Sequence, residues 1–182
     1  MARLPYIDPA TAPNMAELLQ ALPDLHLFRM IAHAETVMTP WLGLGGALLS
    51  SLSLDPVLRE LAVLQVAVTT GNDYERVQHQ AIAAAVGAPD AAVEAVLGHW
   101  LDAPALTGHA PVLRVVEQLV TTHSTTPAGI DALRAHLDER QTVELLLLVG
   151  YYLGLAVLIA AVDLDPDAPA HQVVADGVEA KG

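Results

Sequence analysis

Segment 54–87 constrains the fold of this chain more than any other part of the sequence. It reads LDPVLRELAVLQVAVTTGNDYERVQHQAIAAAVG. Asp55 followed by Pro56 is a typical helix start, because the carboxylate caps free amides and proline fits the first helical turn. Gly71 and Gly87 are typical helix ends, since glycine adopts the left-handed backbone conformation at low cost. The segment therefore predicts two helices joined by a tight turn.

The rest of the chain repeats this pattern of helices separated by proline, glycine and capping residues. Apolar residues recur at helical spacing, and no segment shows the alternation typical of a strand. Asp24 is expected to cap a helix over 24–34, and Pro40 is expected to open a restarted turn within 35–51. We predict an all-α helical bundle that is oligomeric, with further helices over 14–22, 88–97, 111–123, 124–137 and 138–162.

The two ends of the chain differ from this helical body. Residues 1–13 hold three prolines and are expected to form an extended arm that packs on the body or on a neighbouring subunit. Residues 14–165 form the helical domain, and residues 166–182 are an acidic tail that we expect to be mobile. The first residues lack the apolar run of a signal peptide, so a cytoplasmic location is expected.

Apolar residues make up 53% of the chain, which is high for a soluble protein. Surplus apolar surface is usually hidden in subunit contacts, so we expect a homo-oligomer. The longest apolar stretch, 145–162, is about long enough to span a bilayer. Glu144 and Asp163 close it tightly and no cluster of lysine or arginine flanks it, so a buried helix is favoured over a membrane span.

Charge and cysteine content exclude several classes of function. The net charge is −13, from 21 acidic and 8 basic residues. No nucleic-acid partner is expected, because phosphate contacts need clustered lysine and arginine. The chain contains no cysteine. Disulfides, thiolate catalysis, iron–sulfur clusters and cysteine-based zinc sites are therefore excluded.

Acid–base residues concentrate in the two helices of segment 54–87. Glu60 lies in the apolar face of the first helix, and His79 lies on the second, four residues after Glu75. Tyr74 and Gln78 form a parallel pair beside them. The helix geometry gives an axial offset of roughly 7 Å between Glu60 and His79. The spacing therefore does not decide between a direct hydrogen bond and a bridge through water or Tyr74.

Such a pocket can tune a carboxyl and an imidazole for proton transfer near neutral pH. The alternative is that Glu60 and His79 are polar residues satisfied within a core or interface, or that the Glu75/His79 pair lies on a solvated face. No HExxH motif is present, so neither a metal ion nor a cofactor is predicted.

The spacing of these residues resembles the AhpD-like / carboxymuconolactone decarboxylase family. Redox members carry E-x11-C-x2-C-x3-H, and counting back from His79 places the family glutamate on Glu60. The two cysteine positions fall on Asn72 and Glu75, and a proton-relay position falls on Tyr74. The resemblance extends over about residues 3–165 and points to a cysteine-free branch.

The resemblance implies a lyase or isomerase that uses acid–base chemistry on a small organic acid or lactone, and not thiol peroxidase chemistry. His79 would be the principal acid or base, Glu60 would orient or relay, Tyr74 would stabilise an oxyanion, and Glu75 would be a second carboxylate, or itself the base. It also implies trimers or hexamers. The alternatives are a non-catalytic ligand-binding or structural oligomer, and a thiol-independent antioxidant role.

Further residues are expected to contact the substrate. Arg29 is a possible counter-charge for a carboxylate, because basic residues are few. Tyr151 and Tyr152, on the last helix, are expected to serve core packing. The predicted substrate-binding residues are Arg29, His33, Trp41, Asn72 and Gln78.

Overall fold

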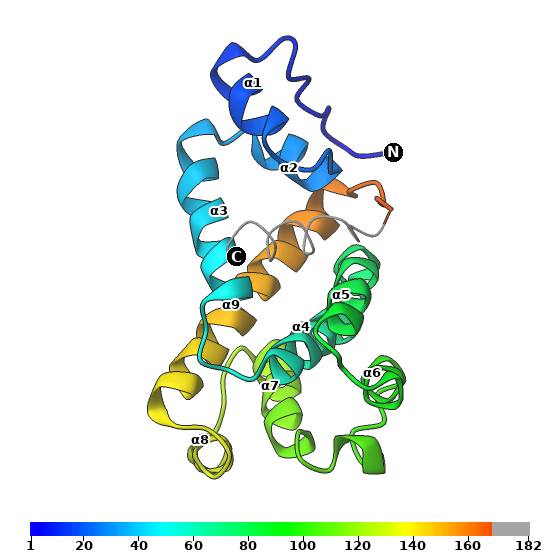
Figure 1. The fold of residues 1–182 in the computed structure, drawn as a ribbon, viewed down its shortest axis with the longest axis vertical. Helices are drawn as coiled ribbons and strands as arrows, with labels where there is room; N and C mark the ends of the chain where they lie inside the picture. Colours follow the sequence, from blue (N-terminus) through cyan, green and yellow to red (C-terminus); the bar gives the residue numbers. More distant parts are fainter. Residues whose placement is uncertain (169–182) are drawn as a thin grey trace.

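The computed structural model describes residues 1–168, and every regular element within them is helical. This part of the chain forms nine α-helices, whose arrangement can be followed in Figure 1. They are α1 (Pro13–Gln20), α2 (His26–Ile31), α3 (Glu35–Ser50), α4 (Pro56–Thr70), α5 (Asp73–Ala85), α6 (Asp90–Leu97), α7 (Ala110–Thr122), α8 (Pro127–Arg134) and α9 (Glu139–Val162), with a 3-10 turn, η1 (Pro104–Leu106), before α7. The all-α prediction is confirmed.

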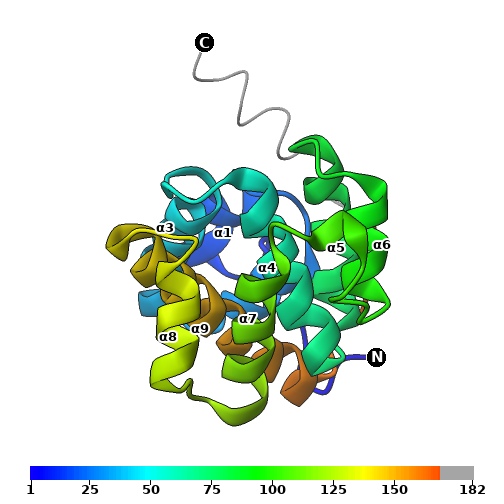
Figure 2. The ribbon, with the colours of Figure 1, turned by 90° about the horizontal axis from the view of Figure 1, so that it is seen from below.

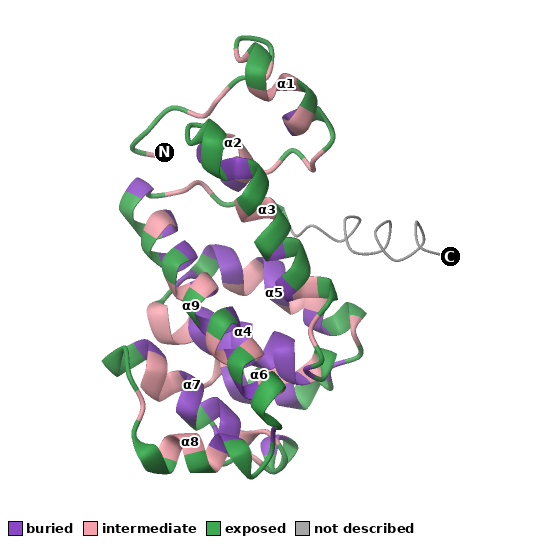
Figure 3. Cartoon of the chain, turned by 90° about the vertical axis from the view of Figure 1, so that its left-hand side faces the viewer, coloured by how far each residue is buried: buried purple, intermediate pink, exposed green. Residues whose placement is uncertain are grey.

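Helix α4 is the centre of the molecule. It packs against α5, α6, α7 and α9 (Figure 2). Every residue from 58 to 67 on α4 is buried, polar ones included. Figure 3 shows that buried residues gather on α4, α7 and α9, whereas α1 and α3 are mostly exposed or intermediate. A polar residue on α4 therefore lies in the core and needs a partner there.

The helix ends around α4 form as the sequence predicts. The Asp55 carboxylate accepts a hydrogen bond from the Leu58 amide at 2.9 Å. Gly71 ends the helix with φ of +67°, in the left-handed region. The Asn72 side chain then accepts from the Glu75 amide at 3.2 Å and caps α5. The turn that joins the two central helices is thus determined by neighbouring residues.

Two predicted helix starts are wrong. Asp24 does not cap α2, which begins at His26 after Leu25 and has no side-chain cap. Pro40 lies inside α3, which runs without a break from Glu35 to Ser50. Proline removes one amide and leaves the carbonyl four residues earlier without its usual donor. That carbonyl belongs to Thr36, on an exposed turn where water can replace the donor.

The capping box of α9 supports a stability prediction. Asp138 accepts from the Gln141 amide at 2.7 Å, and the Gln141 side chain accepts from the Asp138 amide at 3.1 Å. Asp138→Ala is expected to lower the free energy of unfolding by ~1 kcal/mol, measured by urea denaturation. The exposed Asp131→Ala change on α8 is the control, expected within about 0.5 kcal/mol of the natural chain. Equal values for both variants would contradict this role.

The N-terminal arm packs on the end of α9. The Arg3 amide donates to the Val162 carbonyl at 2.7 Å, and the Tyr6 hydroxyl donates to Asp165 at 2.9 Å. The tail predicted for 166–182 lies outside the described residues except for 166–168. Within that short part, Asp167 and Ala168 accept hydrogen bonds from Tyr74 and Gln78.

Helix α9 runs diagonally through the molecule from α8 towards α2 (Figure 1). Among the described helices it alone is long and apolar enough to cross a membrane, and 44% of its most apolar window is buried inside the molecule. One side of this helix forms part of the core, and the opposite side is exposed.

Candidate active site

A row of four charged side chains lies buried between α4 and α5. Glu60 accepts from Arg59 Nε at 2.8 Å through one oxygen and lies 2.7 Å from His79 Nδ1 through the other. The second imidazole nitrogen, His79 Nε2, lies 3.3 Å from a Glu75 carboxylate oxygen. The contact between Glu60 and His79, which the hairpin spacing left open, is direct. The side chains bridge the axial offset because α4 and α5 pack closely along their length.

Contacts within the row favour the charged forms of His79 and Glu60. Burial by itself lowers the pKa of His79, but the hydrogen bonds to Glu60 and Glu75 outweigh it and raise that pKa to about 9. Burial would raise the pKa of Glu60, yet the hydrogen bond and charge of His79, followed by those of Arg59, leave it lowered. His79 is therefore an imidazolium at neutral pH and donates to a carboxylate on each side.

This raised pKa predicts how stability depends on pH. The pKa of His79 rises from 6.5 to about 9 on folding, so its stabilisation is fully present below about pH 6.5 and is lost as pH rises through about 9. The loss should be on the order of 3 kcal/mol, measured as the free energy of unfolding across this window. The His79→Gln variant should lack this slope. An unchanged slope in that variant would contradict the assignment.

The row ends at the wall of a largely apolar cavity of about 330 Å³. His79 and Glu75 line this cavity, while Glu60 is 0% exposed and lies behind them with Arg59. The residues that line it are Leu22, Leu25, Leu27, Phe28, Trp41, Leu42, Gly45, Gly46, Leu49, Tyr74, Glu75, Gln78, His79, Ile82, Tyr151, Tyr152 and Leu155. Glu75 and His79 thus border the cavity, whereas Glu60 is connected to it only through its contact with His79.

Aromatic side chains from α3 and α9 complete the wall. Trp41 stacks on Tyr151 with ring centroids 5.3 Å apart. Tyr152 meets the His79 ring edge-on at 4.9 Å, and burial followed by nearby carboxylates raises its pKa well above the ordinary value. Tyr151 and Tyr152, assigned to core packing from the sequence, therefore line the cavity as well.

Gly45 permits this packing of the aromatic wall. A β-carbon at Gly45 would lie 2.5 Å from the Tyr151 hydroxyl, so any larger residue would displace that ring.

Five of the predicted site residues line the cavity: Trp41, Tyr74, Glu75, Gln78 and His79. Tyr74 contributes its ring, but its hydroxyl donates to Asp167 at 2.7 Å. The proton assigned to a substrate oxyanion is therefore engaged elsewhere. Burial and then the Asp167 contact raise the pKa of Tyr74, which keeps the hydroxyl neutral.

Arg29, His33 and Asn72 do not line the cavity. Arg29 donates from Nε to the Ile7 carbonyl at 3.1 Å, and His33 Nε2 lies 2.7 Å from the Pro5 carbonyl. Both side chains hold the N-terminal arm, which the sequence did not connect to them. Asn72, which was expected to contact the substrate, instead caps α5 by accepting from the Glu75 amide.

Two polar residues of the site were missed. Arg59 is buried and completes the charge row, and its signal was a charged pair within an apolar helix. Asp167 accepts from the His26 amide at 2.7 Å as well as from Tyr74. No local pattern connects Asp167 to residues so far away in the chain.

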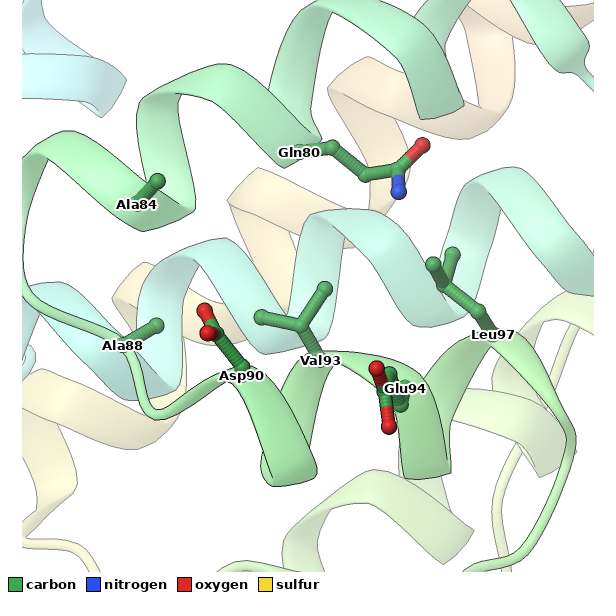
Figure 4. A pocket seen from close by; sticks show the side chains of 7 residues that line it. All are labelled: Gln80, Ala84, Ala88, Asp90, Val93, Glu94 and Leu97. Carbon is green, nitrogen blue, oxygen red and sulfur yellow. The ribbon is translucent and has the colours of Figure 1, made fainter.

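A second hollow, of about 210 Å³, lies between α5 and α6 (Figure 4). Among the described residues that line it, the ionisable ones are Asp90 and Glu94 on α6, and both are acidic. The first cavity therefore remains the candidate active site. Within residues 1–168, no three histidine, aspartate or glutamate side chains are grouped so as to hold a metal ion.

Comparison with known proteins gives a family match and a fold. Residues 35–118 match the carboxymuconolactone decarboxylase family. These residues belong to that family. The matched segment carries all four members of the charge row, whereas Tyr151, Tyr152 and Asp167 lie beyond it. No curated protein matches the chain significantly.

Two solved structures show the fold. One is the alkylhydroperoxidase AhpD core of an uncharacterized peroxidase-related protein from Ralstonia eutropha JMP134, with a TM-score of 0.76 at 17% identity over 91% of this chain and 92% of that one. The other is an uncharacterized peroxidase-related protein from Silicibacter sp. TM1040, with a TM-score of 0.76 at 17% identity over 94% of each chain. The fold is AhpD-like, and the absence of cysteine fits the family's cysteine-free branch.

Proposed function

We propose that this family member catalyses proton transfer on a neutral, mainly apolar small molecule that carries a carbonyl group, such as a lactone. The observation that supports this is the hydrogen-bonded row Arg59–Glu60–His79–Glu75, which ends at the wall of an apolar cavity. A buried acid–base pair that reaches a cavity is the arrangement that general acid–base catalysis requires.

Glu75 is the proposed base, and the His79 imidazolium is the proposed stabiliser of the charge that develops on the substrate. The Glu75 carboxylate accepts a proton from the substrate carbon next to the carbonyl, and the electron pair of that bond moves onto the carbonyl oxygen. The negative charge that Glu75 loses then lies on the substrate, beside the His79 imidazolium, which stabilises it. Glu60 holds His79 in its charged form throughout. In a lactone whose enolate is conjugated with a carbon–carbon double bond, return of the proton to the far carbon of that bond shifts the double bond and completes an isomerisation.

The charges of the row favour a neutral substrate. Two cations, Arg59 and His79, balance two carboxylates, Glu60 and Glu75, so the row carries no net charge. Within residues 1–168, no lysine or arginine lines the cavity, and Arg29 instead donates to the Ile7 carbonyl. A substrate carboxylate would lose its hydration beside Glu75 without gaining a cation of its own. A lactone is therefore favoured over a free organic acid.

The proposal is tested by proton exchange in deuterated water. Candidate lactones and their ring-opened hydroxy acids are incubated with the protein, and deuterium at the carbon next to the carbonyl is followed by NMR. We expect exchange of a lactone and none of its ring-opened acid. Exchange confined to the acids would overturn the proposed substrate class.

A non-catalytic role is the second candidate, because both nitrogens of His79 are already in contact with carboxylates. In that case the apolar cavity binds a small molecule without changing it. Saturable lactone binding by calorimetry, without deuterium exchange for any bound compound, would favour this role.

A further inference from the structure

The outer side of α9 carries an exposed stripe without a charged residue. It consists of Val143, Leu147, Gly150, Gly154, Val157 and Ala161, and all six are exposed. Val143, Leu147 and Val157 are 55%, 58% and 65% exposed. Exposed apolar side chains that are grouped on one face mark interaction sites, whereas scattered ones do not. The spacing of four and three residues in alternation is that of a helix-packing seam.

The stripe is symmetric about its own middle. Val143 lies as far from the centre as Ala161, Leu147 as far as Val157, and Gly150 as far as Gly154. If two such helices run antiparallel across a two-fold axis, the larger side chains of one meet apolar side chains of the other. The glycines then meet at the centre, and a β-carbon at either one would find no atom within 4 Å in this chain. Open space at both glycines lets two helices approach closely.

Charges at the ends of the stripe complement each other in the same arrangement. Glu139, at the start of α9, has a side chain 83% exposed and lies 3.2 Å from Arg134 of its own chain. Arg3 donates to the Ala161 carbonyl at 3.0 Å, which places a cation at the other end of the stripe. An antiparallel pair brings Glu139 of one chain near Arg3 of the other, at both ends of the contact. A chain of net charge −13 repels its copies unless the contact is uncharged and its borders are complementary.

We propose that two copies of this chain associate through this stripe, with their α9 helices antiparallel about a two-fold axis. The contact is isologous, because the same surface serves both chains. The contact covers the side of α9 opposite Tyr152. Each chain therefore packs against the outer side of the partner's α9, whose inner side lines the partner's own cavity. This inference concerns an interaction surface and does not depend on the proposed reaction.

The absence of native cysteine makes a cross-linking test specific. Leu147→Cys and Val157→Cys are prepared as two separate variants, mixed, and oxidised. In the antiparallel pair position 147 faces 157, whereas two copies of position 147 are roughly 15 Å apart along the axis. That separation exceeds the roughly 7 Å between α-carbons that a disulfide allows. We expect a covalent dimer in the mixture and little in either variant alone.

Controls with similarly exposed side chains come from α3. Val37 and Leu44 are 52% and 48% exposed, similar to the stripe residues, so Val37→Cys and Leu44→Cys test for random collision. Cross-linking of these controls as fast as the mixture would overturn the proposal. Cross-linking of Leu147→Cys alone would indicate a parallel pair and would also overturn it.

A charge exchange tests the same pairing without cross-linking. L147E and V157K, each alone, are expected to convert the dimer to monomer by light scattering, because each buries charges without a partner. The double variant L147E/V157K is expected to regain the dimer, since its opposite charges face each other across the axis. Helical circular dichroism confirms that each variant is folded. A natural chain that is monomeric at all concentrations would overturn the proposal.

A lipid bilayer is the other occupant that such an apolar helix can have. Flotation of the natural chain with phosphatidylcholine–phosphatidylglycerol vesicles distinguishes the two. Flotation that L147E abolishes, without any dimer in solution, would assign the stripe to lipid and overturn the proposal. Absence of flotation together with a dimer supports it.

Discussion

Replacement of Glu75 by glutamine is expected to reduce lactone turnover by ~10²–10⁴-fold, the usual contribution of a positioned general base. Glutamine keeps the size of the side chain and can still accept from His79 Nε2 through its amide oxygen, but it cannot take a proton from the substrate. The loss should fall on the chemical step, so substrate affinity should change little. The measurement is deuterium exchange by NMR with the same lactones, at saturating substrate.

Glu94→Gln is the matched control for this variant. Glu94 lies on α6 and lines the second hollow, away from the charge row (Figure 4). Its replacement is expected to leave the exchange rate unchanged. If Glu75→Gln and Glu94→Gln react equally fast, Glu75 is not the base. If exchange is lost only in His79→Gln, the imidazole itself takes that role.

Glu60→Ala is expected to destabilise the protein by about 3–5 kcal/mol, a large share of the total stability of a single domain. The change leaves Arg59 and the His79 imidazolium buried without the carboxylate that both contact. Glu60 is 0% exposed, so water cannot replace it. The measurement is urea denaturation near neutral pH, with helical circular dichroism as the signal.

An exposed ion pair provides the comparison. Arg134 lies 3.2 Å from Glu139, and both side chains are more than half exposed. Arg134→Ala is expected to cost less than about 1 kcal/mol, because water screens the pair. Similar losses for Glu60→Ala and Arg134→Ala would show that the buried row contributes no special stability.

Much of the helical framework was predictable because its signals are local. The caps at Asp55, Asn72 and Asp138 each bind an amide three residues onward, and the left-handed glycine at position 71 ends α4. Such contacts depend only on residues within one turn. Pro40 shows the limit, since proline inside a helix is tolerated where the turn around it is exposed.

The pairing of acid and base was only partly predictable. Spacing placed Glu60, Glu75 and His79 on two adjacent helices, but the distances between their atoms depend on how closely α4 and α5 pack. The sequence also could not separate Arg29, which binds the Ile7 carbonyl, from residues that face the cavity. Arg29 and Gln78 are both ordinary residues for a helix surface. Only the tertiary structure places Arg29 against the N-terminal arm and Gln78 at the cavity.

By itself, the sequence determined an all-helical chain without thiol chemistry, with an acid–base set at Glu60, Glu75 and His79. The start and end of the first central helix follow from one aspartate–proline pair and one glycine, each acting over a few residues. Tertiary structure decided the cavity, its aromatic wall and the contact of Tyr74 with Asp167, which is 93 residues away. These features arise from packing between distant segments, and no local spacing encodes the distance between groups that meet only when the whole chain has folded.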